Sequence, residues 1–174
     1  MVKRILPQRS DDPRIQAYYE FLEFFRITKL YTVQFRRPGD YAKLLALLGN
    51  PERELKFVHI AGTNGKGSTA AMTASILQKA GYTVGLYTSP YIYTFHERMQ
   101  VNGEMITDRE LIDITRYVKP LADSMTDSPT EFELVSCIAF EFFKRRNCDI
   151  VVLEVGMGGA LDSTNVIPCP EVAV

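Results

Sequence analysis

The sequence predicts an α/β domain built on a parallel sheet. Short apolar runs alternate with segments of helical period, and polar, glycine-containing segments follow the apolar runs. We expect strands at residues 57–61, 84–88 and 150–155, and residues 172–174 resemble the start of a fourth strand. The order strand, helix, strand, helix, helix, strand is typical of a parallel sheet with right-handed crossovers.

Length and composition narrow the class of protein. The chain has 174 residues, which suits one compact domain, and 20 Lys plus Arg balance 21 Asp plus Glu. That balance gives no electrostatic footprint for nucleic acid or an anionic membrane, so we expect neither as a partner. No apolar run approaches the roughly 20 residues of a membrane-spanning helix. The three cysteines are widely spaced and form no CxxC pair, which favours a reduced, cytoplasmic compartment.

The first part of the chain predicts helix and loop. Apolar residues at helical spacing indicate a helix over residues 15–25, and the mixed aromatic and basic stretch 28–40 reads as a loop. Asp40 is a candidate cap for a short helix that runs to Leu48 and stops at the Gly-Asn-Pro sequence of residues 49–51.

The remaining connections follow the strands. We expect a helix over residues 68–80 with Gly81 after its end, and an irregular loop over residues 91–103. Two further helices each begin with a capping box, in which Thr107 pairs with Glu110 and Thr130 with Glu133.

Three polar segments leave strand ends, where ligands of parallel sheets bind. They are residues 62–68, the pair Ser89-Pro90, and residues 154–165. In the first, glycines let backbone N–H groups converge on one point at a helix N-terminus, which suits phosphate. Lys66 can reach the outer phosphates, and Ser68 or Thr69 can offer a hydroxyl to phosphate or magnesium. A glycine-rich turn with a solvated lysine is the structural alternative, which the strand–loop–helix context disfavours.

Other candidate residues keep two interpretations. Glu154 lies in an apolar strand, where a carboxylate is costly unless it is paired or holds a metal, although it could also cap a loop at the strand end. Ser89 could be a turn residue. Phe132 fits the apolar stripe of its helix equally well, and Asp162 is a natural turn former.

Three motifs resemble one family. Residues 59–69, in which Gly67 separates the P-loop lysine from the serine, are similar to the P-loop of ATP-dependent amide ligases, which include the Mur ligases and the folate ligases. Residues 87–90 with Glu97-Arg98 resemble a strand end and omega loop of folylpolyglutamate and dihydrofolate synthases. Residues 153–159 and 161–165 resemble their second signature. The resemblance implies a Mur ligase-like central domain.

The resemblance also implies a reaction and its residues. ATP would phosphorylate a folate carboxylate, and the amine of L-glutamate would attack the acyl phosphate. Lys66 would be catalytic and Mg²⁺ the cofactor, with Ser89 and Glu154 as its ligands. The implied ATP-binding residues are Thr63, Asn64, Gly65, Lys66, Gly67, Ser68 and Thr69. The implied folate-binding residues are Thr130, Phe132, Glu133, Leu161, Asp162 and Ser163.

Alternatives remain at this level. The leading expectation is tetrahydrofolate–polyglutamate ligase, and the closest alternatives are dihydrofolate synthase and a bifunctional enzyme. An ATP-binding module without ligase chemistry is an alternative from another class. The resemblance further implies that residues 1–174 are the N-terminal part of the ATP-binding domain, without the C-terminal ligase domain. We therefore expect little or no activity from this chain alone, and a monomer at full length.

Overall fold

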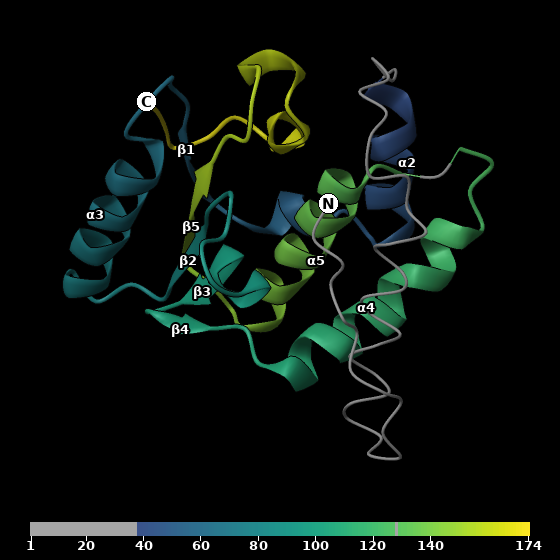
Figure 1. Cartoon of the computed structure of the whole chain (residues 1–174), viewed down its shortest axis with the longest axis horizontal. Helices are drawn as coiled ribbons and strands as arrows, with labels where there is room; N and C mark the ends of the chain where they lie inside the picture. Colours follow the sequence, from purple (N-terminus) through teal and green to yellow (C-terminus); the bar gives the residue numbers. More distant parts are fainter. Residues whose placement is uncertain (1–37, 128) are drawn as a thin grey trace, which may run out of the picture.

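The computed structural model of the chain describes residues 38–127 and 129–174, and their core is a six-stranded sheet (Figure 1). The strand order is β4-β3-β2-β5-β1-β6, and the strands β2, β5, β1 and β6 run parallel. The expected α/β fold with a mainly parallel sheet is therefore confirmed. The strands are β1 (Phe57–Ile60), β2 (Val84–Tyr87), β3 (Met99–Val101), β4 (Glu104–Met105), β5 (Ile150–Glu154) and β6 (Val172–Ala173).

Helices cover both faces of the sheet. Helix α3 lies on one face, and α5 lies on the other with α4 and α2 packed outside it (Figure 1). The described helices are α2 (Pro38–Leu47), α3 (Lys66–Lys79), α4 (Asp108–Asp123) and α5 (Glu131–Arg145). None of the helices in the described part of the chain is long and apolar enough to cross a membrane.

The central strand β5 explains why its sequence is almost wholly apolar. It pairs with β1 on one side and β2 on the other, so its side chains alternate between two covered faces. Val152 packs in the cluster beneath α3, whereas Val151 and Leu153 belong to the larger cluster beneath α5. Buried side chains on both faces fix the register of the strand, because a one-residue slip would exchange the two sets.

The expectation of an irregular loop over residues 91–103 is wrong in its second half. Strand β3 pairs antiparallel with β2, and β4 pairs antiparallel with β3, so the sheet is mixed at this edge. Asn102 and Gly103 join the two strands with φ values of 51° and 82°. Asn-Gly favours this tight hairpin because both residues tolerate positive φ. The signal was present in the sequence and was masked by the aromatic and polar residues before it.

The ends of the helices differ from expectation by a few residues. Helix α3 begins at Lys66, two residues before the expected start. The predicted helix over 15–25 lies outside the described residues, as does most of the predicted loop over 28–40. Helix α2 begins at Pro38, within that loop, and ends at Leu47. The chain turns away through Gly49 and Asn50, both with positive φ.

Both predicted capping boxes are confirmed. The N–H of Thr107 donates to Glu110 Oε2 over 2.9 Å, and the N–H of Glu110 donates back to Thr107 Oγ1 over 3.3 Å. The same reciprocal pair joins Thr130 and Glu133, with distances of 2.6 and 3.3 Å. Two otherwise unpaired N–H groups are thus satisfied at each helix start.

Candidate functional site

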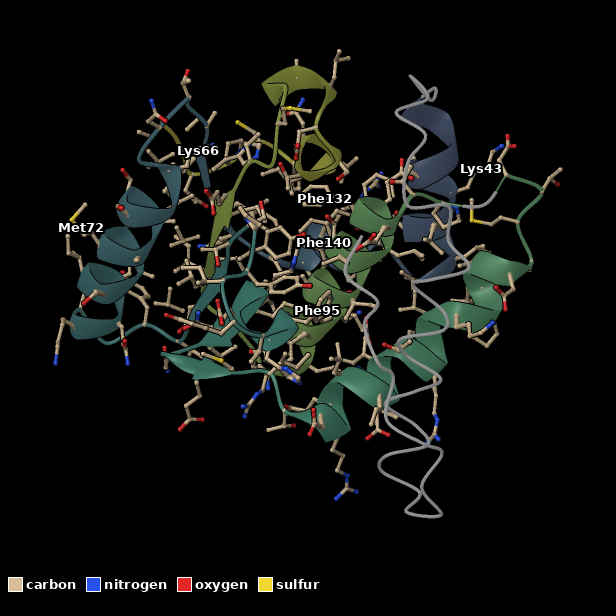
Figure 2. The ribbon with its side chains drawn as sticks, viewed as in Figure 1. Lys43, Lys66, Met72, Phe95, Phe132 and Phe140 are labelled. Atoms are coloured by element: carbon tan, nitrogen blue, oxygen red, sulfur yellow. The ribbon has the colours of Figure 1, made fainter. Side chains whose placement is uncertain are left out.

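The P-loop lies between β1 and α3. Gly65 precedes the helix with φ of 76°, and no side chain caps the first turn of α3. The N–H groups of that turn therefore face outward at the positive end of a 14-residue helix. Lys66, at the same end of α3 in Figure 2, is half-buried. Its stem lies over Gly62, where an added Cβ would be 3.6 Å from Lys66 Cγ. The arrangement is that of an anion-binding turn with a lysine beside it.

The predicted ATP-binding residues form one continuous surface segment. Residues 63–65 and Ser68 are exposed, whereas Lys66, Gly67 and Thr69 are half-buried. The backbone N–H of Thr69 bonds to the carbonyl of Gly65 over 2.9 Å, which closes the first turn of the helix.

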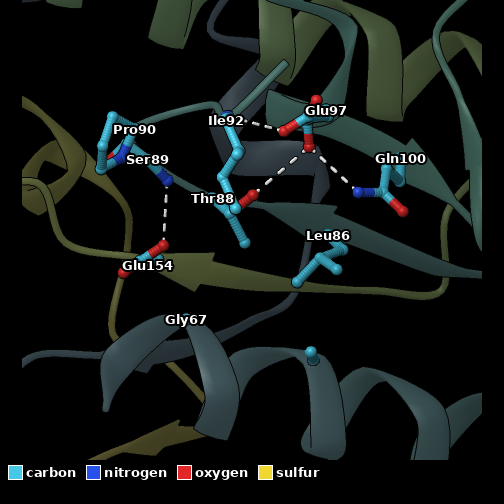
Figure 3. A pocket seen from close by; sticks show the side chains of 10 residues that line it. Gly67, Leu86, Thr88, Ser89, Pro90, Ile92, Glu97, Gln100 and Glu154 are labelled. Carbon is cyan, nitrogen blue, oxygen red and sulfur yellow. Dashed lines mark hydrogen bonds between the residues drawn. The ribbon is translucent and has the colours of Figure 1, made fainter. Parts of the chain in front are cut away.

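Ser89 and Glu154, the two predicted magnesium ligands, lie in contact. The Ser89 N–H donates to Glu154 Oε2 over 2.9 Å, and Glu154 is only 4% exposed (Figure 3). A Cβ added at Gly67 would lie 3.6 Å from both carboxylate oxygens. The first turn of α3 therefore lies next to the carboxylate. The segments that follow β1, β2 and β5 meet here, as the strand-end pattern predicted.

A cavity of about 280 Å³ opens beside this pair (Figure 3). Gly67, Ser89 and Glu154 line one side, and Ile92 and Glu97 from the loop after β2 line another. Within the described residues, no group of three or more His, Cys, Asp or Glu side chains is placed to hold a metal ion. A cation here would take two protein oxygens, from Ser89 and Glu154, and other donors would complete its coordination.

The loop after β2 is held by Glu97. Its carboxylate accepts the backbone N–H groups of Ile92, Tyr93 and Thr94 over 2.7 to 2.8 Å. The N–H groups of Ile92 and Thr94, with that of Tyr93, lower the pKa of Glu97. Thr94 and Glu97 have the spacing of a capping box, so the bond to the Thr94 N–H was readable from the sequence and was missed. The bonds to the N–H groups of Ile92 and Tyr93 depend on the fold of the loop.

Arg98 gives the same loop a second attachment. Its guanidinium lies over the rings of Tyr91 and Phe95, 5.3 and 5.7 Å from their centroids. The two rings pack edge to face at 6.1 Å. Cation–π and aromatic contacts of this kind favour one loop conformation.

The second signature folds around Asp162. Its Oδ1 accepts the N–H and the hydroxyl of Thr164 over 2.9 and 2.6 Å, and its Oδ2 accepts the N–H of Met157 over 2.8 Å. Both oxygens of this predicted folate ligand are thus engaged within the loop. Leu161 is 76% exposed, whereas Ser163 Oγ is buried and has no hydrogen-bond partner.

The start of α5 lies against this loop. The Phe132 ring is 6.2 Å from that of Tyr87, and a Cβ added at Gly156 would lie 2.7 Å from Phe132 Cζ. Phe132 is half-buried against the main core. It therefore packs as a core residue, and part of its side chain stays exposed to solvent. The side chains of Thr130 and Glu133 are occupied by their capping box. The structure therefore brings Phe132 and the second signature together, separately from the phosphate end of the site.

Known proteins with similar sequences are folate enzymes. The chain is 47% identical over 134 residues to a dihydrofolate synthase/folylpolyglutamate synthase of Bacillus subtilis, a match that covers 74% of this chain and 31% of that protein. No protein-family model matches the chain.

Solved structures that resemble this chain are also those of folylpolyglutamate synthases. The crystal structure of a folylpolyglutamate synthase from Thermotoga maritima superposes with a TM-score of 0.82 at 41% identity, over 89% of this chain and 36% of that one. A complex of a folylpolyglutamate synthase with AMPPCP and folate superposes with a TM-score of 0.82 at 37% identity, over 90% and 39%. The chain thus spans about a third of the length of these proteins.

Proposed function

We propose that this chain, which by sequence and structure belongs with the folylpolyglutamate and dihydrofolate synthases, provides the ATP site of a ligase that adds L-glutamate to a folate. The observation that carries the proposal is the uncapped first turn of α3 beside the contact between the half-buried Ser89 and the buried Glu154. This arrangement combines a phosphate-binding turn with oxygen donors for a divalent cation. The relative solved with AMPPCP and folate supports both ligand classes.

The side chains present fit Mg²⁺. Magnesium prefers oxygen donors and is usually held by one or two carboxylates together with substrate phosphates. Glu154 is a buried carboxylate at the end of β5, and Ser89, which follows β2, brings a hydroxyl to the same edge of the sheet. The phosphate-binding turn is next to them. When bound, Mg²⁺ would neutralise charge on the phosphates.

The residues of the chain would act mainly by position and charge. The N–H groups at the start of α3 would bind phosphate oxygens, and Lys66 would stabilise the phosphoryl group as it moves from ATP to the folate carboxylate. ADP leaves in that step. The amine of glutamate then attacks the acyl carbon, loses a proton, and displaces phosphate.

Tetrahydrofolate is the folate that we propose, and dihydropteroate is the second candidate. The Bacillus subtilis relative carries both activities in its name, which favours testing for a bifunctional enzyme. The remaining partners that we propose are small molecules, namely ATP and L-glutamate, and we propose that the protein is cytoplasmic.

The test is glutamate incorporation by the complete protein with ATP and magnesium, offering tetrahydrofolate and dihydropteroate separately. We expect incorporation with tetrahydrofolate, and Lys66→Ala should reduce it by at least about a hundredfold, in the range found when one stabilising group is removed from a catalytic site. An ATPase activity that neither folate changes would instead support an ATP-binding module without ligase chemistry.

A further inference from the structure

A chain of hydrogen bonds joins the strand before the P-loop to the second signature. His59 Nε2 lies 2.9 Å from Thr164 Oγ1, across 105 positions of sequence. Thr164 is fully buried, and its hydroxyl lies 2.6 Å from Asp162 Oδ1. None of these side chains contributes to the capping boxes or to the contact between Ser89 and Glu154.

Strand alternation explains why His59 reaches this loop. Phe57 packs in the core beneath α5, whereas Val58 and Ile60 pack beneath α3. His59 therefore faces the α5 side, where the loop after β5 crosses the end of the sheet. A half-buried ring with polar nitrogens requires a polar partner there, and Thr164 supplies it.

The direction of the bonds follows from the donors available. The Asp162 carboxylate accepts the Thr164 hydroxyl proton, so Thr164 Oγ1 offers His59 a lone pair. His59 therefore donates from Nε2, and this donor is present in one neutral tautomer and in the protonated ring. Burial lowers the pKa of His59, opposed by the charge of Asp162, so the neutral ring with its proton on Nε2 is favoured.

We propose that His59 and Thr164 are positioning residues that attach residues 156–166 to β1, the strand that precedes the P-loop. Asp162 is the residue of this loop that accepts the hydrogen bond from the Thr164 hydroxyl. Asp162 also accepts the N–H of Met157, so one carboxylate fixes both ends of the turn. Resting on the proposed function, we infer that this network sets the position of Leu161 and Ser163 relative to the ATP site. It would act on folate binding through the loop rather than through the Asp162 carboxylate.

The matched variants are Thr164→Val, which removes the hydroxyl and keeps the shape, and Thr164→Ser, which keeps the hydroxyl. In the complete protein, Thr164→Val should accelerate hydrogen–deuterium exchange in residues 156–166 by at least about tenfold, because it removes the two hydrogen bonds of the hydroxyl, to His59 and to Asp162. Thr164→Ser should stay within about twofold of wild type. Residues 91–98 serve as the internal control and should not change.

Kinetics provide a second readout that a general loss of stability would not produce. Thr164→Val should raise the KM for folate about tenfold while the KM for ATP stays within about twofold. His59→Phe added to Thr164→Val should cause no further change, because both act through one chain of bonds.

Unchanged exchange in Thr164→Val would overturn the inference, as would equal effects of the Val and Ser variants or a parallel rise in the KM for ATP. Failure of the proposed function is distinguishable, because wild-type protein would then show no folate-dependent incorporation. The exchange experiment would still decide whether the network holds the loop.

Discussion

Replacing Glu154 by Gln should separate metal binding from folding. Glu154 is 4% exposed, and no described Lys, Arg or His forms an ion pair with it. Its one hydrogen bond in the described part of the chain, from the Ser89 N–H, can be accepted equally by the amide oxygen of Gln. Because a buried carboxylate is costly when its partner among the described residues is a neutral backbone N–H, Glu154→Gln without ligand should be as stable as wild type or more stable, by about 0 to 2 kcal/mol.

The ligand-bound state should respond in the opposite direction. At a Mg-ATP concentration of about 100 times Kd, wild type gains about 2.7 kcal/mol, which corresponds to a rise in Tm of about 2 to 4 °C for a protein about three times the length of this chain. If Gln weakens binding about a hundredfold, the same concentration gives about 0.4 kcal/mol, or less than about 1 °C. The assay is thermal unfolding of the complete protein with and without Mg-ATP.

Glu141→Gln is the matched control, because Glu141 is also buried, at 7% exposed, and lies far from the site on α5. Its Oε1 accepts a hydrogen bond from Arg145 Nε over 2.7 Å, so the amide loses an ion pair. Glu141→Gln should lower stability by about 0.5 to 1 kcal/mol and keep the full Mg-ATP shift. The reasoning fails if Glu154→Gln keeps that shift, or if it unfolds more easily than wild type without ligand.

Three further changes follow from local geometry. Glu97→Gln should accelerate hydrogen–deuterium exchange of the backbone amides of residues 92–94, because the ionised carboxylate accepts hydrogen bonds from them. In wild type the same acceleration should appear only as the pH falls through the lowered pKa of Glu97, which lies below its ordinary 4.5. Gly156→Ala should destabilise the fold by about 1 to 3 kcal/mol in urea unfolding, because its Cβ would lie 2.7 Å from Phe132 Cζ. Under native conditions a thiol reagent should label Cys169 quickly and the two buried cysteines slowly, as mass spectrometry would show.

Each of these has a contrasting result. Gly67→Ala is the control for Gly156→Ala, because its Cβ would meet no atom closer than 3.6 Å, and equal destabilisation of the two would contradict the steric reasoning. Equal exchange in Glu97→Gln and wild type at neutral pH would show that Arg98 alone holds the loop. Fast labelling of Cys148, whose pKa burial raises to about 12, would contradict its buried position.

Local sequence patterns were sufficient to predict most of the helices and strands and their order along the chain. Apolar runs bounded by glycine located β1, β2 and β5, and the two capping boxes located the starts of α4 and α5 within a residue. These signals act between neighbours in sequence, so they can be read without knowing the fold. The Asn102-Gly103 turn is also a local signal, but the strands that it joins are only three and two residues long, which is too short for a clear apolar alternation.

The convergence of three strand ends was predictable in outline, since parallel strands present their carboxyl ends at one edge. The sequence by itself determined that residues 62–68, Ser89 and Glu154 belong to that edge. Only the tertiary structure decided which groups remain open to a ligand. Glu154 keeps an oxygen beside the phosphate-binding turn, whereas the carboxylate of Asp162 is occupied by Thr164 and Met157. The bonds of Asp162 are local, between residues two and five positions apart, and they depend on the conformation that the loop adopts against the sheet. The contact between Ser89 and Glu154 spans 65 positions, and it depends on the packing of separate strands, which no sequence spacing encodes.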